Sequence, residues 1–154
     1  MIKVLMICHG NICRSAAAEV VLNQMAREMG AEDRIRAESA AATTEEIGND
    51  IYPPMKRALL VRGYACPPHS ARLTVRADYA KYDYIIGMDD ENMRDMCRIY
   101  GGDPQRKLSR LLDWAGMTGA SISDPWYTRD FEGALDEIER GCRGLIQTLI
   151  AKER

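Results

Sequence analysis

The sequence lacks any apolar run long enough to predict a membrane-spanning helix, which needs about 18 consecutive apolar residues. Charged side chains make up 29% of the 154 residues and are spread along the chain. The first seven residues hold one lysine and no segment typical of a secretory signal. We therefore expect a cytoplasmic protein without a membrane span.

A large excess of charge of either sign is also missing. The formal net charge is −2 at pH 7, with no block of like charges, so the basic surface typical of nucleic-acid-binding proteins is not indicated. Internal repeats and low-complexity segments are absent as well. The length suits a single domain over residues 1–154, and any attraction for an anion must be local.

Cysteine pairs at metal-binding or disulfide spacing are absent. The five cysteines are an odd number without a Cys-x-x-Cys motif, and the chain has only two histidines. This excludes the patterns typical of secreted disulfide frameworks and of zinc sites. We expect reduced thiols, no metal and no other cofactor.

What is present is an alternation of strand-like and helix-like segments. Apolar patterns predict strands at 3–8, 34–40, 82–88 and 107–112, and helices at 15–29, 53–62, 73–80, 91–100 and 131–151. The predicted fold class is α/β, a single domain with a central four-stranded parallel sheet and helices on both faces. Ligands in such folds bind at the carboxyl ends of the strands, so the loop after the first strand is the candidate phosphate-binding loop.

That loop begins at Cys8 and ends at Ser15. It joins a buried strand to a helix, a place where backbone N–H groups and the helix dipole attract an anion and favour a thiolate. Arg14 offers a planar fork for two phosphoryl oxygens, while successive N–H groups from His9 onward take the remaining charge. These residues predict a nucleophile and an anion clamp at the two ends of one cradle.

Other loop residues suit a curved backbone. Gly10 permits a turn or a close approach to a ligand, and Asn11 tolerates a left-handed conformation while its amide braces the loop. Ser15 can donate to the Cys8 sulfur or cap the helix. A cysteine and an arginine six residues apart are more often structural, but the full pattern Cys-x-Gly-Asn-x-Cys-Arg-Ser after a strand is specific.

With this pattern the chain resembles the low-molecular-weight protein tyrosine phosphatases. Further matches span nearly the whole sequence: Glu38-Ser39-Ala40-Ala41, Glu46-Ile47-Gly48-Asn49, His69-Ser70-Ala71-Arg72, Met88-Asp89-x-x-Asn92 and Ser123-Asp124-Pro125-Trp126-Tyr127. The resemblance implies a metal-independent protein-tyrosine-phosphatase that acts on a phosphotyrosine protein or an aryl phosphate. It makes Cys8 the nucleophile that forms a cysteinyl phosphate, Arg14 the phosphate clamp and Asp124 the general acid and base.

The resemblance also suggests roles for residues around this centre. Trp126 and Tyr127 match the aromatic wall against which a phosphotyrosine ring packs. Ser39 and His69, together with Asn11, match a hydrogen-bond network that holds the phosphate loop.

Two further residues keep alternative interpretations. Asp89 matches a carboxylate near the acid loop, and it suits equally an N-cap ahead of Asn92. Cys13 implies, by the same resemblance, a disulfide with an oxidised Cys8 and a redox-sensitive enzyme, although it can also simply pack.

Three positions around the substrate site bear on which substrate is accepted. Glu45 stands where many tyrosine-specific members carry an aromatic residue, which removes half of the ring-binding wall and disfavours acidic peptides. Ile12 stands where phosphoarginine-selective relatives carry Thr, which favours phosphotyrosine. His9 replaces an apolar or small residue and can add pH dependence to phosphate binding.

Two other functions stay open at this point. A thiol-linked arsenate reductase on the same fold needs two further redox cysteines, and residues 88–92 hold none. A non-catalytic phosphoprotein-binding module would keep Arg14 but would not need Asp124. A partner tyrosine kinase is suggested only by the resemblance to bacterial members that act beside such kinases.

Overall fold

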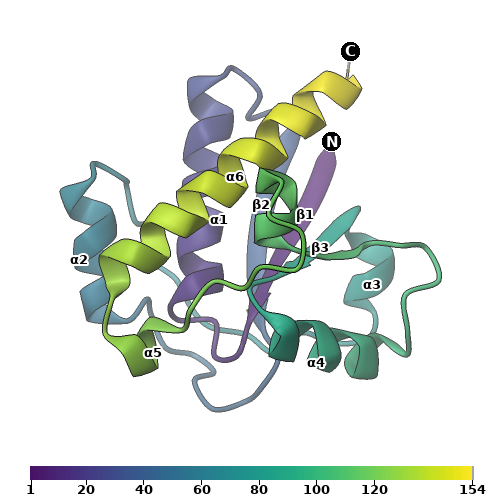
Figure 1. The fold of residues 1–154 in the computed structure, drawn as a ribbon, viewed down its shortest axis with the longest axis horizontal. Coiled ribbons are helices and arrows are strands. Elements are labelled where there is room, and N and C mark those ends of the chain that lie inside the picture. The colour runs from purple at the N-terminus through teal and green to yellow at the C-terminus, as the bar shows by residue number, and fades with distance from the viewer. Residues whose placement is uncertain (154) are drawn as a thin grey trace.

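Four parallel strands form the centre of the computed structural model, which describes residues 1–153 (Figure 1). The sheet order is β2-β1-β3-β4, made of β1 (Ile2–Cys8), β2 (Ile35–Ala41), β3 (Tyr84–Gly87) and β4 (Leu108–Arg110). From β1 the chain passes to β2 on one side and later returns to β3 on the other side. The carboxyl end of β1 is therefore the point where the strand order reverses, which is where open α/β sheets bind ligands.

Alternate side chains of β1 point into two separate apolar clusters. Val4 and Met6 pack on one face of the sheet, while Leu5 and Ile7 pack on the other, and all four are fully buried. Burial of each such side chain contributes about 1.5–3 kcal/mol. This two-sided burial explains why the strand reads as a continuous apolar run.

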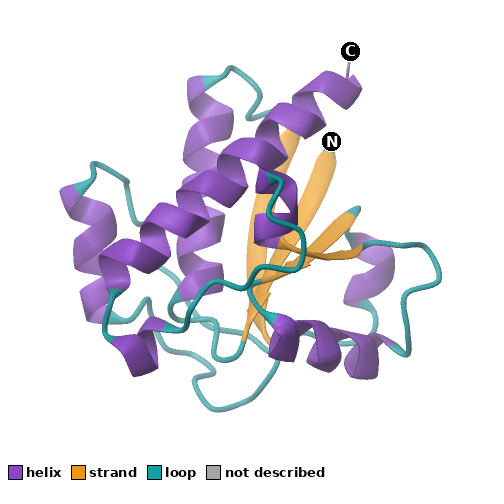
Figure 2. Cartoon of the chain, viewed as in Figure 1, coloured by secondary structure: helices purple, strands orange, loops and turns teal. Residues whose placement is uncertain are grey.

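Helices cover both faces of the sheet (Figure 2). The face that includes Val4 is covered by α1 (Arg14–Glu28) and α6 (Phe131–Glu153), with α2 (Pro53–Val61) beside them, and the opposite face by α3 (Asp78–Lys81) and α4 (Asp90–Tyr100). The predicted fold class is thus confirmed. Within residues 1–153, no helix is both long and apolar enough to cross a membrane.

Glycines allow α6 to lie directly on a short 3-10 helix, η1 (Leu111–Ala115). A Cβ atom at Gly144 would stand 2.0 Å from the carbonyl oxygen of Trp114, and one at Gly141 would stand 2.5 Å from Cγ of Leu111. Real Cβ atoms do not approach that closely, so side chains at both positions would push the two elements apart. This contact holds η1 against α6, and the segment that follows η1 leads to Asp124.

Two predicted elements were wrong in extent. The segment predicted as a helix at 73–80 is helical only in α3, and Leu73 instead forms a parallel bridge to Ala41 at the sheet edge. Asp78 accounts for the late start, because its carboxylate accepts the backbone N–H of Val75 and the hydroxyl of Thr74. These side-chain bonds hold the preceding residues in a turn instead of a helix.

The strand predicted at 107–112 ends at Arg110, and η1 follows it. The Asp113 carboxylate accepts the backbone N–H groups of Arg110 and Gly119, which draws the chain into a tight turn. A second short helix, α5 (Pro125–Thr128), was also not predicted. The remaining predicted strands and helices agree with the structure to within about two residues at each end, and Gly30 ends α1 in the left-handed conformation at φ +66°.

Candidate active site

The loop after β1 is held in a curved shape by bonds to Asn11. Asn11 is fully buried and has a positive φ of 60°. Its Oδ1 accepts the backbone N–H of Arg72 at 3.3 Å, and its carbonyl oxygen lies 2.6 Å from Nε2 of His69. The backbone N–H groups of residues 10–14 find no hydrogen-bond acceptor among residues 1–153, so they form a set of donors suited to an anion.

The Cys8 thiol lies at the centre of this loop, at the carboxyl end of β1. It is buried, with its Sγ 3.0 Å from Oγ of Ser15 and 3.4 Å from the Ser15 backbone nitrogen. Nδ2 of Asn11 donates to the same Oγ at 2.9 Å, which leaves the Ser15 hydroxyl hydrogen free to point at the sulfur. Two hydrogen-bond donors of Ser15 are therefore directed at Sγ.

Arg14 is oriented by two separate segments of the chain, the end of β3 with the start of α4 and the loop before α5. Its side chain is only 2% exposed, and Nη1 donates to Oδ2 of Asp89 at 2.7 Å and to the carbonyl oxygen of Ile122 at 2.9 Å. Nη2 lies 3.5 Å from Oδ2 of Asp124. Burial alone disfavours the guanidinium, but the negative charges of Cys8, Asp89 and Asp124 outweigh it and raise the pKa of Arg14. The Arg14 guanidinium is therefore fixed in place and positively charged, as the binding of an anion requires.

Asp89 combines the two interpretations that its sequence context allowed. Its Oδ2 holds Arg14, while its Oδ1 accepts the backbone N–H of Asn92 at 2.8 Å and caps α4. The carboxylate is thus fixed from both sides and serves as the support on which the Arg14 guanidinium rests.

Asp124 approaches the site from the loop before α5. Its Oδ1 accepts the backbone N–H of Trp126 at 3.0 Å, which makes it the N-cap of α5, and Oδ2 faces Arg14. The loop is fixed upstream because Ile122 N–H donates to the carbonyl oxygen of Met88, the residue that follows β3. A partly exposed carboxyl group is thereby held at the edge of the Cys8 loop.

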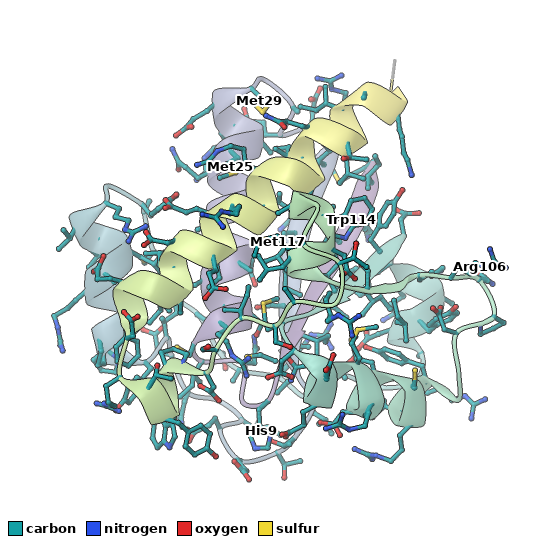
Figure 3. All side chains as sticks on the ribbon, viewed as in Figure 1. His9, Met25, Met29, Arg106, Trp114 and Met117 are labelled. Atoms are coloured by element: carbon teal, nitrogen blue, oxygen red, sulfur yellow. The ribbon has the colours of Figure 1, made fainter. Side chains whose placement is uncertain are left out.

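These residues surround one cavity of about 330 Å³. Its lining consists of the Cys8 loop, the acid loop and the segment after β2, namely Cys8, His9, Gly10, Ile12, Cys13, Arg14, Glu45, Glu46, Asp124, Trp126 and Tyr127. A second cavity of about 320 Å³, whose wall includes Met25 and Met29 (Figure 3), holds no cysteine. The structure thus brings together every residue that the sequence predicted for catalysis and most of those predicted for substrate binding.

Aromatic rings form one wall of the cavity. Trp126 is 49% exposed and Tyr127 is 81% exposed, which leaves both available to a ligand. Tyr52 packs against Trp126, with its ring centroid 5.0 Å from that of Trp126. Sequence reasoning missed Tyr52, whose only signal was an aromatic residue before the Pro-Pro start of α2.

The residues predicted to support the loop fall into two groups. His69 contacts Asn11 directly, whereas the Ser39 hydroxyl donates to Oε1 of Glu19 at 2.5 Å and has no bond to Asn11. Burial raises the pKa of Glu19, while the Ser39 hydrogen bond and the charge of His69 oppose that rise. Glu19 was also missed, because a glutamate inside a helix normally indicates a solvated face.

Two side chains in the cavity differ in chemistry from Cys8. Burial, followed by the negative charges of Cys8 and Asp124, raises the pKa of Cys13, so this thiol stays protonated at neutral pH. His9 lies at the mouth, with Nε2 2.9 Å from Oε2 of Glu45.

Among residues 1–153, no three His, Cys, Asp or Glu side chains gather in a way that could hold a metal ion.

Comparison with known proteins places this geometry in a family. Residues 3–154 match the family model described as low molecular weight phosphotyrosine protein phosphatase. The chain is 36% identical over 155 residues to the low molecular weight protein-tyrosine-phosphatase YfkJ of Bacillus subtilis (strain 168), covering 100% of this chain and 99% of that protein. It is 32% identical over 150 residues to the human low molecular weight phosphotyrosine protein phosphatase, with 94% of each chain covered.

Solved structures agree with these sequence matches. The crystal structure of YfkJ from Bacillus subtilis superposes with a TM-score of 0.96 at 33% identity, covering 100% of this chain and 98% of that chain. A protein tyrosine phosphatase from Entamoeba histolytica, crystallised with Hepes in its active site, gives a TM-score of 0.91 at 26% identity over 100% of both chains. The chain therefore belongs to the low molecular weight phosphotyrosine protein phosphatase family.

Proposed function

We propose that this phosphatase hydrolyses phosphotyrosine by passing the phosphoryl group through Cys8. The observation that carries the proposal is the meeting of a thiol, a buried guanidinium and a carboxyl group around one cavity of about 330 Å³. The relatives described above are named as phosphatases, which favours this chemistry over arsenate reduction or simple phosphoprotein binding. The mechanism has a binding step and two chemical steps.

Binding depends on the loop donors and Arg14. The backbone N–H groups of residues 10–14 and the guanidinium share the charge of the phosphate, which is spread over the three equatorial oxygens during transfer. The phenyl ring lies against Trp126 and Tyr127, where aromatic contact adds about 0.5–1.5 kcal/mol beyond burial. Ile12 lines the same cavity without a hydroxyl, which favours an aromatic ester over phosphoarginine.

In the first chemical step the Cys8 thiolate attacks phosphorus and a sulfur–phosphorus bond forms. The bond from phosphorus to the phenolic oxygen breaks, and protonated Asp124 gives its proton to that oxygen. In the second step Asp124 takes a proton from water, whose oxygen attacks phosphorus. The sulfur–phosphorus bond breaks, inorganic phosphate leaves, and the Cys8 thiolate and the Asp124 acid are restored.

The proposal is tested by steady-state hydrolysis of p-nitrophenyl phosphate in the presence of reductant and a chelator. Cys8→Ser should abolish turnover but keep the affinity for inorganic phosphate, measured by calorimetry, because the donors and Arg14 are unchanged. Peptides that carry phosphotyrosine, phosphoserine or phosphoarginine, assayed in parallel, should be hydrolysed only when they contain phosphotyrosine. Turnover by Cys8→Ser would contradict the covalent mechanism.

The role of Asp124 has a separate test. Asp124→Asn should slow phenyl phosphate more than p-nitrophenyl phosphate, because the poorer leaving group depends more on a proton donor. Equal slowing of both esters would count against Asp124 as the acid.

A cytoplasmic location is part of the same proposal. All five cysteines are free thiols in the structure, which fits a reducing compartment. Fractionation of cells that express the chain, followed by a Cys8-dependent activity assay of each fraction, tests it.

A further inference from the structure

One imidazole joins two carboxylates at the mouth of the cavity. His9 Nε2 lies 2.9 Å from Oε2 of Glu45, and its Nδ1 lies 3.4 Å from Oε1 of Glu91. Glu45 belongs to the segment after β2 and Glu91 to the first turn of α4. Figure 3 shows His9 at the lower edge of the molecule, between α4 and α5, so these contacts lie where a substrate must enter.

We use the term acidic lip for Glu45, Glu46 and Glu91. A protonated His9 would supply one positive charge against the two carboxylates that it contacts, so the group is net negative in either protonation state of the imidazole. Glu46 adds a third carboxylate, and its hydrogen-bond partner, Nδ2 of Asn49 at 2.6 Å, is neutral. The lip therefore carries uncompensated negative charge.

Nearby arginines have other contacts. Arg110 donates to Asp90 at 2.6 Å, and Arg129 lies over the rings of Tyr52 and Phe131 on the aromatic side of the site. Neither guanidinium contacts the lip. Arg94 lies three residues after Glu91 in α4 but forms no ion pair with it, so within residues 1–153 no arginine or lysine is paired with the lip.

The lip is also placed to contact a substrate outside the phosphate itself. Glu45 and Glu46 line the cavity, and the side chains of Glu45 and Glu91 are 65% and 60% exposed. When a phosphotyrosine side chain occupies the cavity, the residues on either side of it in a peptide must pass over this rim. Acidic neighbours would meet repulsion there, and basic neighbours would meet attraction.

We propose that the acidic lip selects phosphotyrosine substrates whose neighbouring residues are basic. This inference rests on the proposed function, because it requires a phosphotyrosine in the cavity. It makes Glu45 and Glu91 specificity-determining residues for substrates larger than an aryl phosphate. Exposed ion pairs are individually weak. Two such pairs, one at Glu45 and one at Glu91, together give an expected preference in kcat/KM of about three- to tenfold.

The experiment compares three phosphotyrosine peptides of equal length whose flanking residues are lysine, glutamine or glutamate. The readout is the ratio of kcat/KM between the lysine and glutamate peptides, so any uniform change in activity cancels. The ratio is measured for wild type, for Glu45→Gln/Glu91→Gln, and for Glu32→Gln as a matched control. Glu32 is exposed and precedes β2, at the edge of the sheet opposite the site.

Wild type and Glu32→Gln should prefer the lysine peptide, and the double variant should bring the ratio close to one. The preference should also shrink at about 1 M salt, where the Debye length is about 3 Å. A wild-type ratio of one or below, or an unchanged ratio in the double variant, would overturn the proposal. Cys8-dependent hydrolysis of p-nitrophenyl phosphate in the same preparations reports on the proposed function separately.

Discussion

Replacing Asp89 tests whether the orientation of Arg14 matters for phosphoryl transfer. Oδ2 of Asp89 lies 2.7 Å from Nη1 of Arg14, whose side chain is 2% exposed. Hydrogen bonds to charged groups contribute about 1.5–3 kcal/mol. If that contribution is fully expressed in the transition state, its loss lowers kcat/KM by about tenfold to about 150-fold.

Two variants separate the two roles of this carboxylate. Asp89→Asn keeps an oxygen that can accept from Asn92 N–H and cap α4, but it removes the charge that faces Arg14. Asp89→Ala removes both, so it should be less stable than Asp89→Asn by about 1 kcal/mol, the usual contribution of an N-cap.

The assay combines steady-state hydrolysis of p-nitrophenyl phosphate with urea unfolding of each variant. We expect both variants to lose kcat/KM to a similar extent and to differ in the free energy of unfolding. If Asp89→Asn keeps kcat/KM within twofold of wild type, Arg14 does not depend on this contact and the reasoning fails.

Two further predictions follow from shifted pKa values. Burial opposes ionisation of Asp78, but bonds from Arg72, Val75 and Thr74 hold its pKa below the usual value. Urea unfolding measured from pH 7 to pH 2 should therefore show a free energy of unfolding that falls below about pH 4. The fall should be less steep in Asp78→Asn. The raised pKa of Cys13 makes its thiolate scarce. After peroxide converts Cys8 to a sulfenic acid, closure of a Cys8–Cys13 disulfide with loss of water should therefore be faster at pH 8.5 than at pH 7. Dithiothreitol should restore activity in wild type, and equal recovery in Cys13→Ser would contradict this pairing.

Much of the fold could be predicted because the strong signals are local. The apolar run of β1 and the helical spacing of apolar residues in α6 arise because β1 is buried in the sheet and one face of α6 packs on it. The segments at 73–80 and 107–112 were predicted less well because single side chains decide them. Asp78 and Asp113 bind backbone N–H groups there, and sequence periodicity does not register such bonds.

The candidate site shows the same division. Cys8, Arg14 and Asp124 were predicted from motifs, and they lie around one cavity, while their roles stay predictions. Glu91 and Tyr52 were not found, because their significance comes from contacts between distant segments. A glutamate in the first turn of a helix is ordinary until His9 is seen beside it.

The contacts of Arg14 make phosphatase activity a reporter of complete folding. Its partners Asp89, Ile122 and Asp124 are 75, 108 and 110 residues further along the chain. A growing polypeptide therefore carries the Cys8 thiol long before Asp124 is added, and until then it lacks an assembled anion site. Premature termination before Asp124 would leave a reactive cysteine without the residues that direct its chemistry, so such fragments should behave as thiols and not as enzymes.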